Sequence, residues 1–125
     1  TGQVKEDVLA RFLQLGVDVH AGEIRFEPRL LDRNAFNPEA TTWSYESRQG
    51  RITEPLPKES LAFTLWGVPI IYQIGSSAEI EIYRDGKLDS KLAGSRLGVD
   101  LSQSLFRREA ALTKLIVRIP ESTLR

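Results

Sequence analysis

The sequence contains no cysteine, no methionine and a single histidine, His20. Without cysteine the chain forms no disulfide bond, thiolate metal site or iron–sulfur cluster, and it has no cysteine nucleophile. One imidazole group is too few for a multi-histidine zinc site or an HExxH helix. We therefore expect neither a metal ion nor another cofactor.

An excess of charge of one sign is also missing, because 17 Lys and Arg residues balance 17 Asp and Glu residues. A net charge of zero gives no electrostatic field that would attract nucleic acid or anionic lipid. No hydrophobic run approaches the roughly 20 residues that a membrane-spanning helix needs, and no secretory signal precedes the first charged residues. We therefore expect a cytoplasmic protein that binds neither nucleic acid nor membrane.

A chain of 125 residues, 41% of them hydrophobic and 27% charged, has the size and composition of one globular domain. Between residues 4 and 15, hydrophobic residues recur at helical spacing, and Gly16 suits the position just past a helix end. This pattern predicts an amphipathic helix over residues 1–16. Residues 17–125 then form a separate unit in which the helical period is lost.

Beyond Gly16 the hydrophobic residues mostly alternate with polar ones, which is typical of half-buried strands. Strands are predicted at residues 17–20, 23–27, 41–46, 51–57, 60–66, 69–74, 78–84, 87–91 and 112–119. We expect a bulge or corner near Gly67, a tight hairpin turn at Asp85 and Gly86, and a helical turn over residues 101–107 capped by Asp100. The fold predicted is mainly β: an antiparallel β-sandwich or jelly roll with one N-terminal amphipathic helix and a short helical turn near the C-terminus.

Two local features follow from the same pattern. His20 has the parity of Asp18 and the opposite parity to Val17 and Val19, so we expect the imidazole to face solvent and the valines to face inward. Residues 29–40 are expected to form a loop that tucks three hydrophobic side chains against the core, namely Leu30, Leu31 and Phe36.

Paired carboxylates are one candidate for catalysis, because two acids on one face can perform acid–base chemistry. Glu79 and Glu81 lie two residues apart and therefore on one face of a strand. On the other face lie Ile80 and Ile82, so the two acids also fit the solvated side of a half-buried strand, opposite Arg or Lys. A small hydrolase or lyase that uses these carboxylates with Tyr72 or Tyr83 remains one alternative function.

Aromatic side chains are the second candidate, because flat rings stack on the apolar faces of sugars. Trp43 and Tyr45 fall on one face of one strand, and Trp66 lies beside the break at Gly67. If exposed, these three residues would form a carbohydrate-stacking surface. The same alternation also fits a structural role for Trp43 and Tyr45 as core residues between sheets.

Several segments resemble the C-terminal β region of large bacterial glycoside phosphorylases of the cellobiose phosphorylase type. They are residues 4–16 (VKEDVLARFLQLG), 17–28 (VDVHAGEIRFEP), 61–72 (LAFTLWGVPIIY), 105–108 (LFRR) and 115–120 (LIVRIP). The likeness covers most of the chain and consists of hydrophobic patterns and turns. None of these segments matches the part of the family that carries the catalytic acid.

The resemblance implies a noncatalytic domain with a structural or domain-packing role in a carbohydrate-active enzyme. In that family a jelly-roll-like β domain packs behind an (α/α) barrel, so residues 1–16 would be the last helix of the neighbouring helical domain. The implied partner is this helical catalytic domain of the parent chain, with a homodimer formed through the parent as a further expectation. The alternative is a carbohydrate-binding module, for which the ligand would be a sugar.

Overall fold

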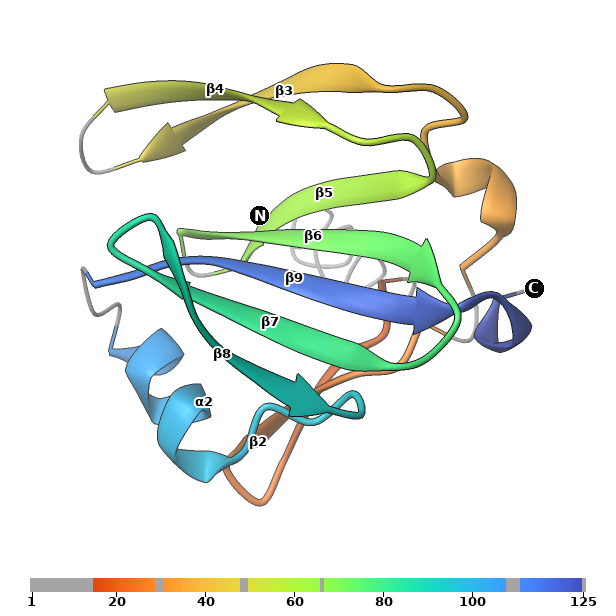
Figure 1. Ribbon diagram of the computed structural model, residues 1–125. Helices are drawn as coiled ribbons and strands as arrows, with labels where there is room; N and C mark the ends of the chain where they lie inside the picture. The colour runs from red at the N-terminus through yellow and green to blue at the C-terminus, as the bar shows by residue number, and fades with distance from the viewer. Residues whose placement is uncertain (1–14, 29–30, 48–49, 66, 108–110, 125) are drawn as a thin grey trace, which may run out of the picture.

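The computed structural model describes residues 15–28, 31–47, 50–65, 67–107 and 111–124 (Figure 1). Residues 1–14 of the predicted N-terminal helix, Leu30 and Trp66 therefore lie outside the described residues. Within the described part, no helix is both long enough and apolar enough to cross a lipid bilayer. The secondary structure is mainly β, as predicted, and the elements assigned in the described residues include one α-helix and two short 3₁₀ helices.

Five strands form the main sheet, in the order β5-β6-β9-β7-β8 (Figure 1). Their bounds are Ser60–Leu65 for β5, Val68–Gly75 for β6, Glu79–Arg84 for β7, Lys87–Ala93 for β8 and Leu112–Pro120 for β9. The last strand enters the middle of the sheet, where it runs parallel to β6 and antiparallel to β7. The predicted antiparallel pairing therefore holds for the other strand pairs and fails only for β6 and β9, because alternation along a strand does not reveal which neighbour the strand selects.

Two hairpins accompany the main sheet instead of a second large sheet. The first joins β1 (Val17–His20) to β2 (Glu23–Phe26), and the second joins β3 (Thr41–Ser47) to β4 (Gly50–Leu56). Between them lies a 3₁₀ helix, η1 (Arg33–Ala35). The sandwich or jelly roll that alternation suggested is not supported by this arrangement of one sheet and two separate hairpins.

Three local predictions can be compared with the structure. The turn at Asp85 and Gly86 is confirmed, and both residues have positive φ angles, 53° and 79°, as a type I′ hairpin turn requires. The break before Val68 is a hairpin turn rather than a bulge or corner, since Leu65 pairs directly with Val68. Helix α2 (Val99–Phe106) is confirmed, but its N-cap is Gly98, and Asp100 lies in the first turn.

The hydrophobic core lies on one face of the main sheet, here called the inner face. Strand β2 and helix α2 contribute to it through Ile24, Phe26 and Leu105, all of which are buried completely. Ser102 joins these two elements, because its hydroxyl group accepts a 2.8 Å hydrogen bond from the main-chain N–H of Ile24 and donates one to the carbonyl of Gly98. The inner face is therefore closed by elements far apart in the sequence.

Tyr72 lies at the centre of this core with no exposed surface. Its ring makes edge-to-face contacts with Phe26 and Phe63, at centroid distances of 6.1 and 5.0 Å. Its hydroxyl group donates a 2.6 Å hydrogen bond to the carbonyl of Leu15, the first described residue. The next residue, Gly16, accepts a hydrogen bond from the N–H of Glu27. The segment that leads into β1 is thus held at both the sheet and the hairpin.

The loop and hairpin expectations agree only in part with this core. Leu31 and Phe36 are buried, as expected, and His20 is exposed. Val19, which was expected to face inward, is 47% exposed. Among the described strands, β1 pairs with β2 alone, and every residue of β1 after Val17 is exposed, so alternation alone does not bury the side chain.

Candidate functional site

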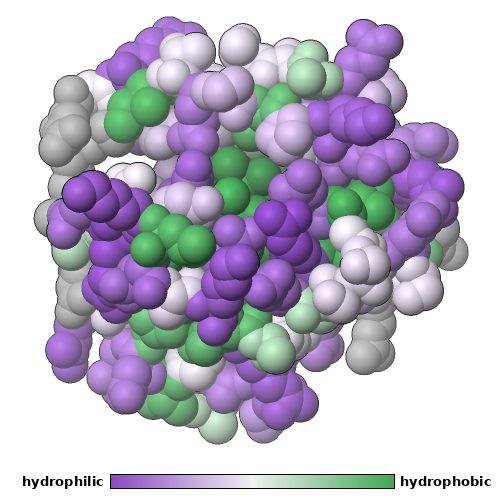
Figure 2. Space-filling view, in the orientation of Figure 1, coloured by the Kyte–Doolittle hydropathy of each residue, from purple (hydrophilic) through white to green (hydrophobic). Residues whose placement is uncertain are grey.

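The opposite side of the main sheet, here called the outer face, carries the candidate site. Strand register places its side chains in three transverse rows. The rows are Lys114, Tyr83 and Leu88; Ile71, Ile116, Glu81 and Lys91; and Gln73, Arg118, Glu79 and Ala93. Figure 2 shows several separate groups of hydrophobic side chains on the face that Figure 1 presents, with hydrophilic side chains between them.

An ion-pair network occupies two of these rows. The guanidinium group of Arg118 donates hydrogen bonds to Oε1 of Glu81 from Nε (2.9 Å) and Nη2 (2.5 Å), and Nη1 donates one of 3.2 Å to Oε1 of Gln73. The carboxylate of Glu79 lies 3.9 Å from Nε of the same arginine. As expected, both acids lie on one face of β7 opposite basic residues.

Glu81, however, is buried, with 6% of its surface exposed, whereas the sequence predicted a solvated position. The reason is that the bulky Arg118 from β9 covers it, and β9 becomes the neighbour of β7 only in the folded sheet. Because one guanidinium group serves both carboxylates, the arrangement is that of a structural ion pair.

Of the two tyrosines proposed as partners of these acids, only Tyr83 lies on the same face of the sheet as they do. Tyr72 lies on the inner face, where burial raises the pKa of its hydroxyl group. Tyr83 does lie on the outer face, and its ring contacts the ammonium group of Lys114, which is 4.6 Å from the ring centroid. The acid pair and Tyr72 are thus on opposite sides of the sheet, which does not favour the hydrolase or lyase alternative.

The β3–β4 hairpin presents one half-buried face and one exposed face. Trp43, Tyr45, Ile52 and Glu54 share the half-buried face, whereas Thr42, Ser44 and Thr53 on the other side are exposed. The rings of Trp43 and Tyr45 lie side by side, with centroids 4.5 Å apart and planes inclined by 33°. Both predicted aromatic residues are therefore neither core residues nor fully exposed.

Glu54 connects this hairpin to the main sheet. Its Oε2 atom accepts a 2.9 Å hydrogen bond from the Tyr45 hydroxyl group, and its Oε1 atom lies 3.4 Å from Nζ of Lys114 on β9. Partial burial and the neighbouring carboxylate together raise the pKa of Tyr45 to about 12. We call the group formed by Trp43, Tyr45, Glu54, Tyr83 and Lys114 the hairpin site.

Sequence reasoning found the aromatic residues of the hairpin site but missed Glu54 and Lys114. The register of the hairpin pairs Trp43 with Glu54, so the turn signal at Gly50 held the information needed to place Glu54 beside Trp43. No comparable local signal exists for Lys114, which is 60 residues away from Glu54 in the chain. Trp66, the third aromatic residue predicted to stack on a sugar, lies outside the described residues.

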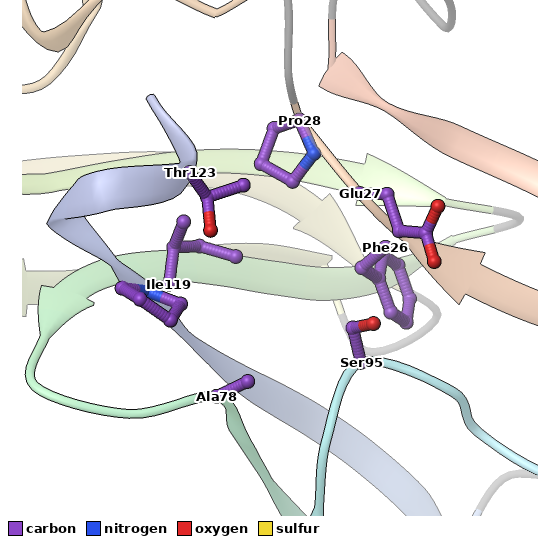
Figure 3. Close-up of a pocket in the computed structure, with 8 residues that line it drawn as sticks. Phe26, Glu27, Pro28, Ala78, Ser95, Ile119 and Thr123 are labelled. Carbon is purple, nitrogen blue, oxygen red and sulfur yellow. The ribbon is translucent and has the colours of Figure 1, made fainter. Parts of the chain in front are cut away.

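A separate pocket of about 180 Å³ opens beside the end of β9 (Figure 3). Its lining is largely hydrocarbon, with the hydroxyl groups of Ser95 and Thr123 as its neutral polar groups. In Figure 3 the carboxylate of Glu27 extends away from Ile119 and Thr123. The pocket therefore offers shape and apolar surface but no pair of groups suited to acid–base or nucleophilic chemistry.

The described residues contain no cluster of three or more His, Cys, Asp and Glu side chains that could hold a metal ion. Comparison of the sequence with protein-family models and with curated proteins finds no match. The candidate site thus has to be interpreted from its own geometry.

Proposed function

We propose that this chain is a noncatalytic β domain of a carbohydrate-active enzyme similar to the glycoside phosphorylases, and that its role is to pack against a neighbouring helical catalytic domain. The observation that carries the proposal is the attachment of Leu15 and Gly16 to the folded domain. Tyr72 binds the carbonyl of Leu15 from the middle of the main sheet, and Glu27 binds the carbonyl of Gly16 from the first hairpin.

This attachment has a mechanical consequence. Leu15 is itself a core residue, 1% exposed, so the chain reaches β1 through a buried and hydrogen-bonded position instead of a solvated linker. Domains joined by flexible linkers move independently, whereas a packed junction fixes their relative position. A junction of this kind suits a domain whose purpose is to support its neighbour. The expected two-layer architecture, with the β3–β4 hairpin as the smaller layer over the outer face, belongs to the same proposal.

The first test is the reading frame from which the chain comes. The proposal expects a helical domain of several hundred residues, with a catalytic carboxylic acid, before Thr1. A reading frame without such a domain contradicts the proposal.

The second test uses the full-length protein with Tyr72→Phe, and Tyr83→Phe as the matched control. Loss of the hydroxyl group at position 72 should loosen the junction, so limited proteolysis should cut near Leu15 sooner and the two domains should unfold at more separate temperatures. Identical behaviour of the two variants would show that the junction does not couple the domains.

A carbohydrate-binding module is the second candidate function, favoured by the half-buried pair formed by Trp43 and Tyr45. Two adjacent rings on one hairpin face, with a carboxylate and an ammonium group beside them, combine an apolar surface with hydrogen-bonding groups, as sugar sites do. Quenching of tryptophan fluorescence by iodide tests it. Oligosaccharides should protect Trp43 from the quencher, and a Trp43→Phe variant should lose that protection.

A further inference from the structure

We infer that the hairpin site binds a neutral saccharide, which stacks on Trp43 and forms hydrogen bonds to Glu54 and Lys114. This inference rests on the second candidate function and deepens it, because it names the polar residues and the class of sugar. It depends on three relationships: the position of Glu54 beside Trp43, the charge balance between Glu54 and Lys114, and the support that Tyr45 and Tyr83 give to these two groups.

The first relationship concerns the shape of a sugar. A pyranose has an apolar face formed by C–H groups and a polar edge formed by hydroxyl groups, so a binding site for it combines an aromatic ring for the face with hydrogen-bonding groups beside that ring for the edge. Trp43 and Glu54 are directly opposite each other in the register of the hairpin. Their Cβ atoms are therefore neighbours on one face, so the carboxylate group and the indole ring are presented on the same face of the hairpin.

The second relationship concerns charge. The Glu54 carboxylate and the Lys114 ammonium group are 3.4 Å apart and have side chains that are 18% and 26% exposed. The two charges balance, so the site gives no net attraction for an anionic sugar, and its carboxylate would repel one. Lys114 keeps donors that Glu54 does not use, and the carboxylate oxygens have further lone pairs. Both groups are thus suited to the hydroxyl groups of an uncharged sugar.

The third relationship concerns order. The Tyr45 hydroxyl group donates to Oε2 of Glu54, and the Tyr83 ring lies against the Lys114 ammonium group. Each polar group is therefore held by an aromatic residue before any ligand arrives. Such preorganisation reduces the conformational entropy that binding would otherwise cost. Tyr45 is a positioning residue in this scheme, since its hydroxyl group acts on the sugar through Glu54.

The test is isothermal titration of the chain with neutral β-linked oligosaccharides of glucose, xylose and mannose, and with an oligogalacturonate as the anionic probe. We expect binding of at least one neutral series and a preference of tenfold or more over the oligogalacturonate. Trp43→Ala should abolish binding, and Glu54→Gln and Lys114→Gln should each weaken it about tenfold, the effect of losing roughly 1.4 kcal/mol. The matched controls Ser44→Ala and Thr53→Ala, on the exposed face of the same hairpin, should bind as the unmodified chain does.

Tyr45→Phe keeps the ring and removes the hydroxyl group. If Tyr45 acts through Glu54, the losses caused by Tyr45→Phe and Glu54→Gln will not add in the double variant. Thermal unfolding of every variant shows whether it is folded, and Glu54→Gln, which is isosteric, provides the decisive measurement if Trp43→Ala does not fold.

The possible outcomes distinguish failure of this inference from failure of the proposed carbohydrate-binding function. Binding that is lost in Trp43→Ala but unchanged in Glu54→Gln and Lys114→Gln would leave the carbohydrate-binding function in place and overturn the inference. A preference for oligogalacturonate would also overturn it. An absence of binding to every sugar by the unmodified chain would remove both.

Discussion

The hydroxyl group of Tyr72 donates a 2.6 Å hydrogen bond to the carbonyl of Leu15, a residue 57 positions earlier in the chain. Both residues are buried, so water has no access to replace this bond if it is broken. The core of this protein therefore contains a buried hydrogen bond that joins β6 to the segment leading into β1. Because of this hydrogen bond, the segment at Leu15 and Gly16 folds together with the main sheet.

Removal of the hydroxyl group should measurably destabilise the chain. In Tyr72→Phe the carbonyl of Leu15 stays buried without this donor, which costs about 1–3 kcal/mol in the free energy of unfolding. Urea unfolding followed by circular dichroism measures the difference. Tyr83→Phe, in which the ring remains half-buried on the outer face, is the control and should change the free energy by less than about 0.5 kcal/mol. Equal losses in both variants would contradict a special role for Tyr72.

The junction predicts a second effect, at Gly16. This residue has a φ angle of +73°, and a Cβ atom there would clash with the main-chain carbonyl of Glu27. Gly22 has a similar φ angle of +78° but open space around it. Both Gly→Ala variants should suffer backbone strain of about 1 kcal/mol or more, and only Gly16→Ala should lose additional stability through the clash. Chemical denaturation of the two variants side by side measures this, and a Gly22→Ala variant at least as unstable as Gly16→Ala would disprove it.

The Arg118 network predicts unequal roles for two neighbouring acids. In Arg118→Met the buried Glu81 loses two charge-assisted hydrogen bonds, so we expect a loss of about 2 kcal/mol in stability at neutral pH. Glu79→Gln should cost less than about 0.5 kcal/mol, because that side chain is about one-third exposed and its oxygen is 3.9 Å from Arg118. Unfolding by guanidinium chloride, which screens the charges, should show a smaller difference between the variants than unfolding by urea. Similar costs for both variants would contradict this account.

Tyr45 gives the protein a pH dependence at alkaline pH. Its pKa is raised from 10.0 to about 12, by burial first and by the Glu54 carboxylate second. The unfolded chain therefore releases the Tyr45 proton at a lower pH than the folded chain does. The stability linked to this proton is fully present below pH 10 and is lost as pH rises from 10 to about 12.

Absorbance of tyrosinate near 295 nm follows this titration, and Tyr45→Phe identifies the signal. In the variant, stability should fall less steeply between pH 10 and 12 than in the unmodified chain. In Glu54→Gln the pKa of Tyr45 should drop toward 10 without reaching it, because burial remains. If Tyr45 titrated near 10 in the unmodified chain, the contact between its hydroxyl group and Glu54 would be excluded in solution.

The main sheet limits association through the edge formed by β8. Strand β8 lies at one edge of the sheet and is largely exposed. Its pairing with β7 shifts register between Ile82 and Tyr83, and it carries Lys87 and Lys91. Bulges and lysines at an edge discourage the addition of another strand. These features of β8 therefore oppose the pairing of this edge with a strand from a second copy of the chain.

Much of the local structure was predictable because it depends on neighbouring residues. The pair Asp85 and Gly86 specifies its turn through the backbone angles that it tolerates, and the hydrophobic pattern from Leu112 to Ile119 specifies a strand. Trp43 and Tyr45 were recognised as a pair because residues two apart share a face of a strand. These are short-range properties, and the structure confirms the turn, the strand and the shared face.

The sequence by itself therefore determined where the chain extends, where it turns and which side chains share a face. Only the tertiary structure decided that β9 would lie between β6 and β7, and with that choice Arg118 came to cover Glu81 and Lys114 came to meet Glu54. The physical reason is that the pairing energy of a strand comes from its neighbours, and several neighbours can satisfy the same alternating pattern. The groups that complete the hairpin site are distant in the chain and become partners only when that choice is made.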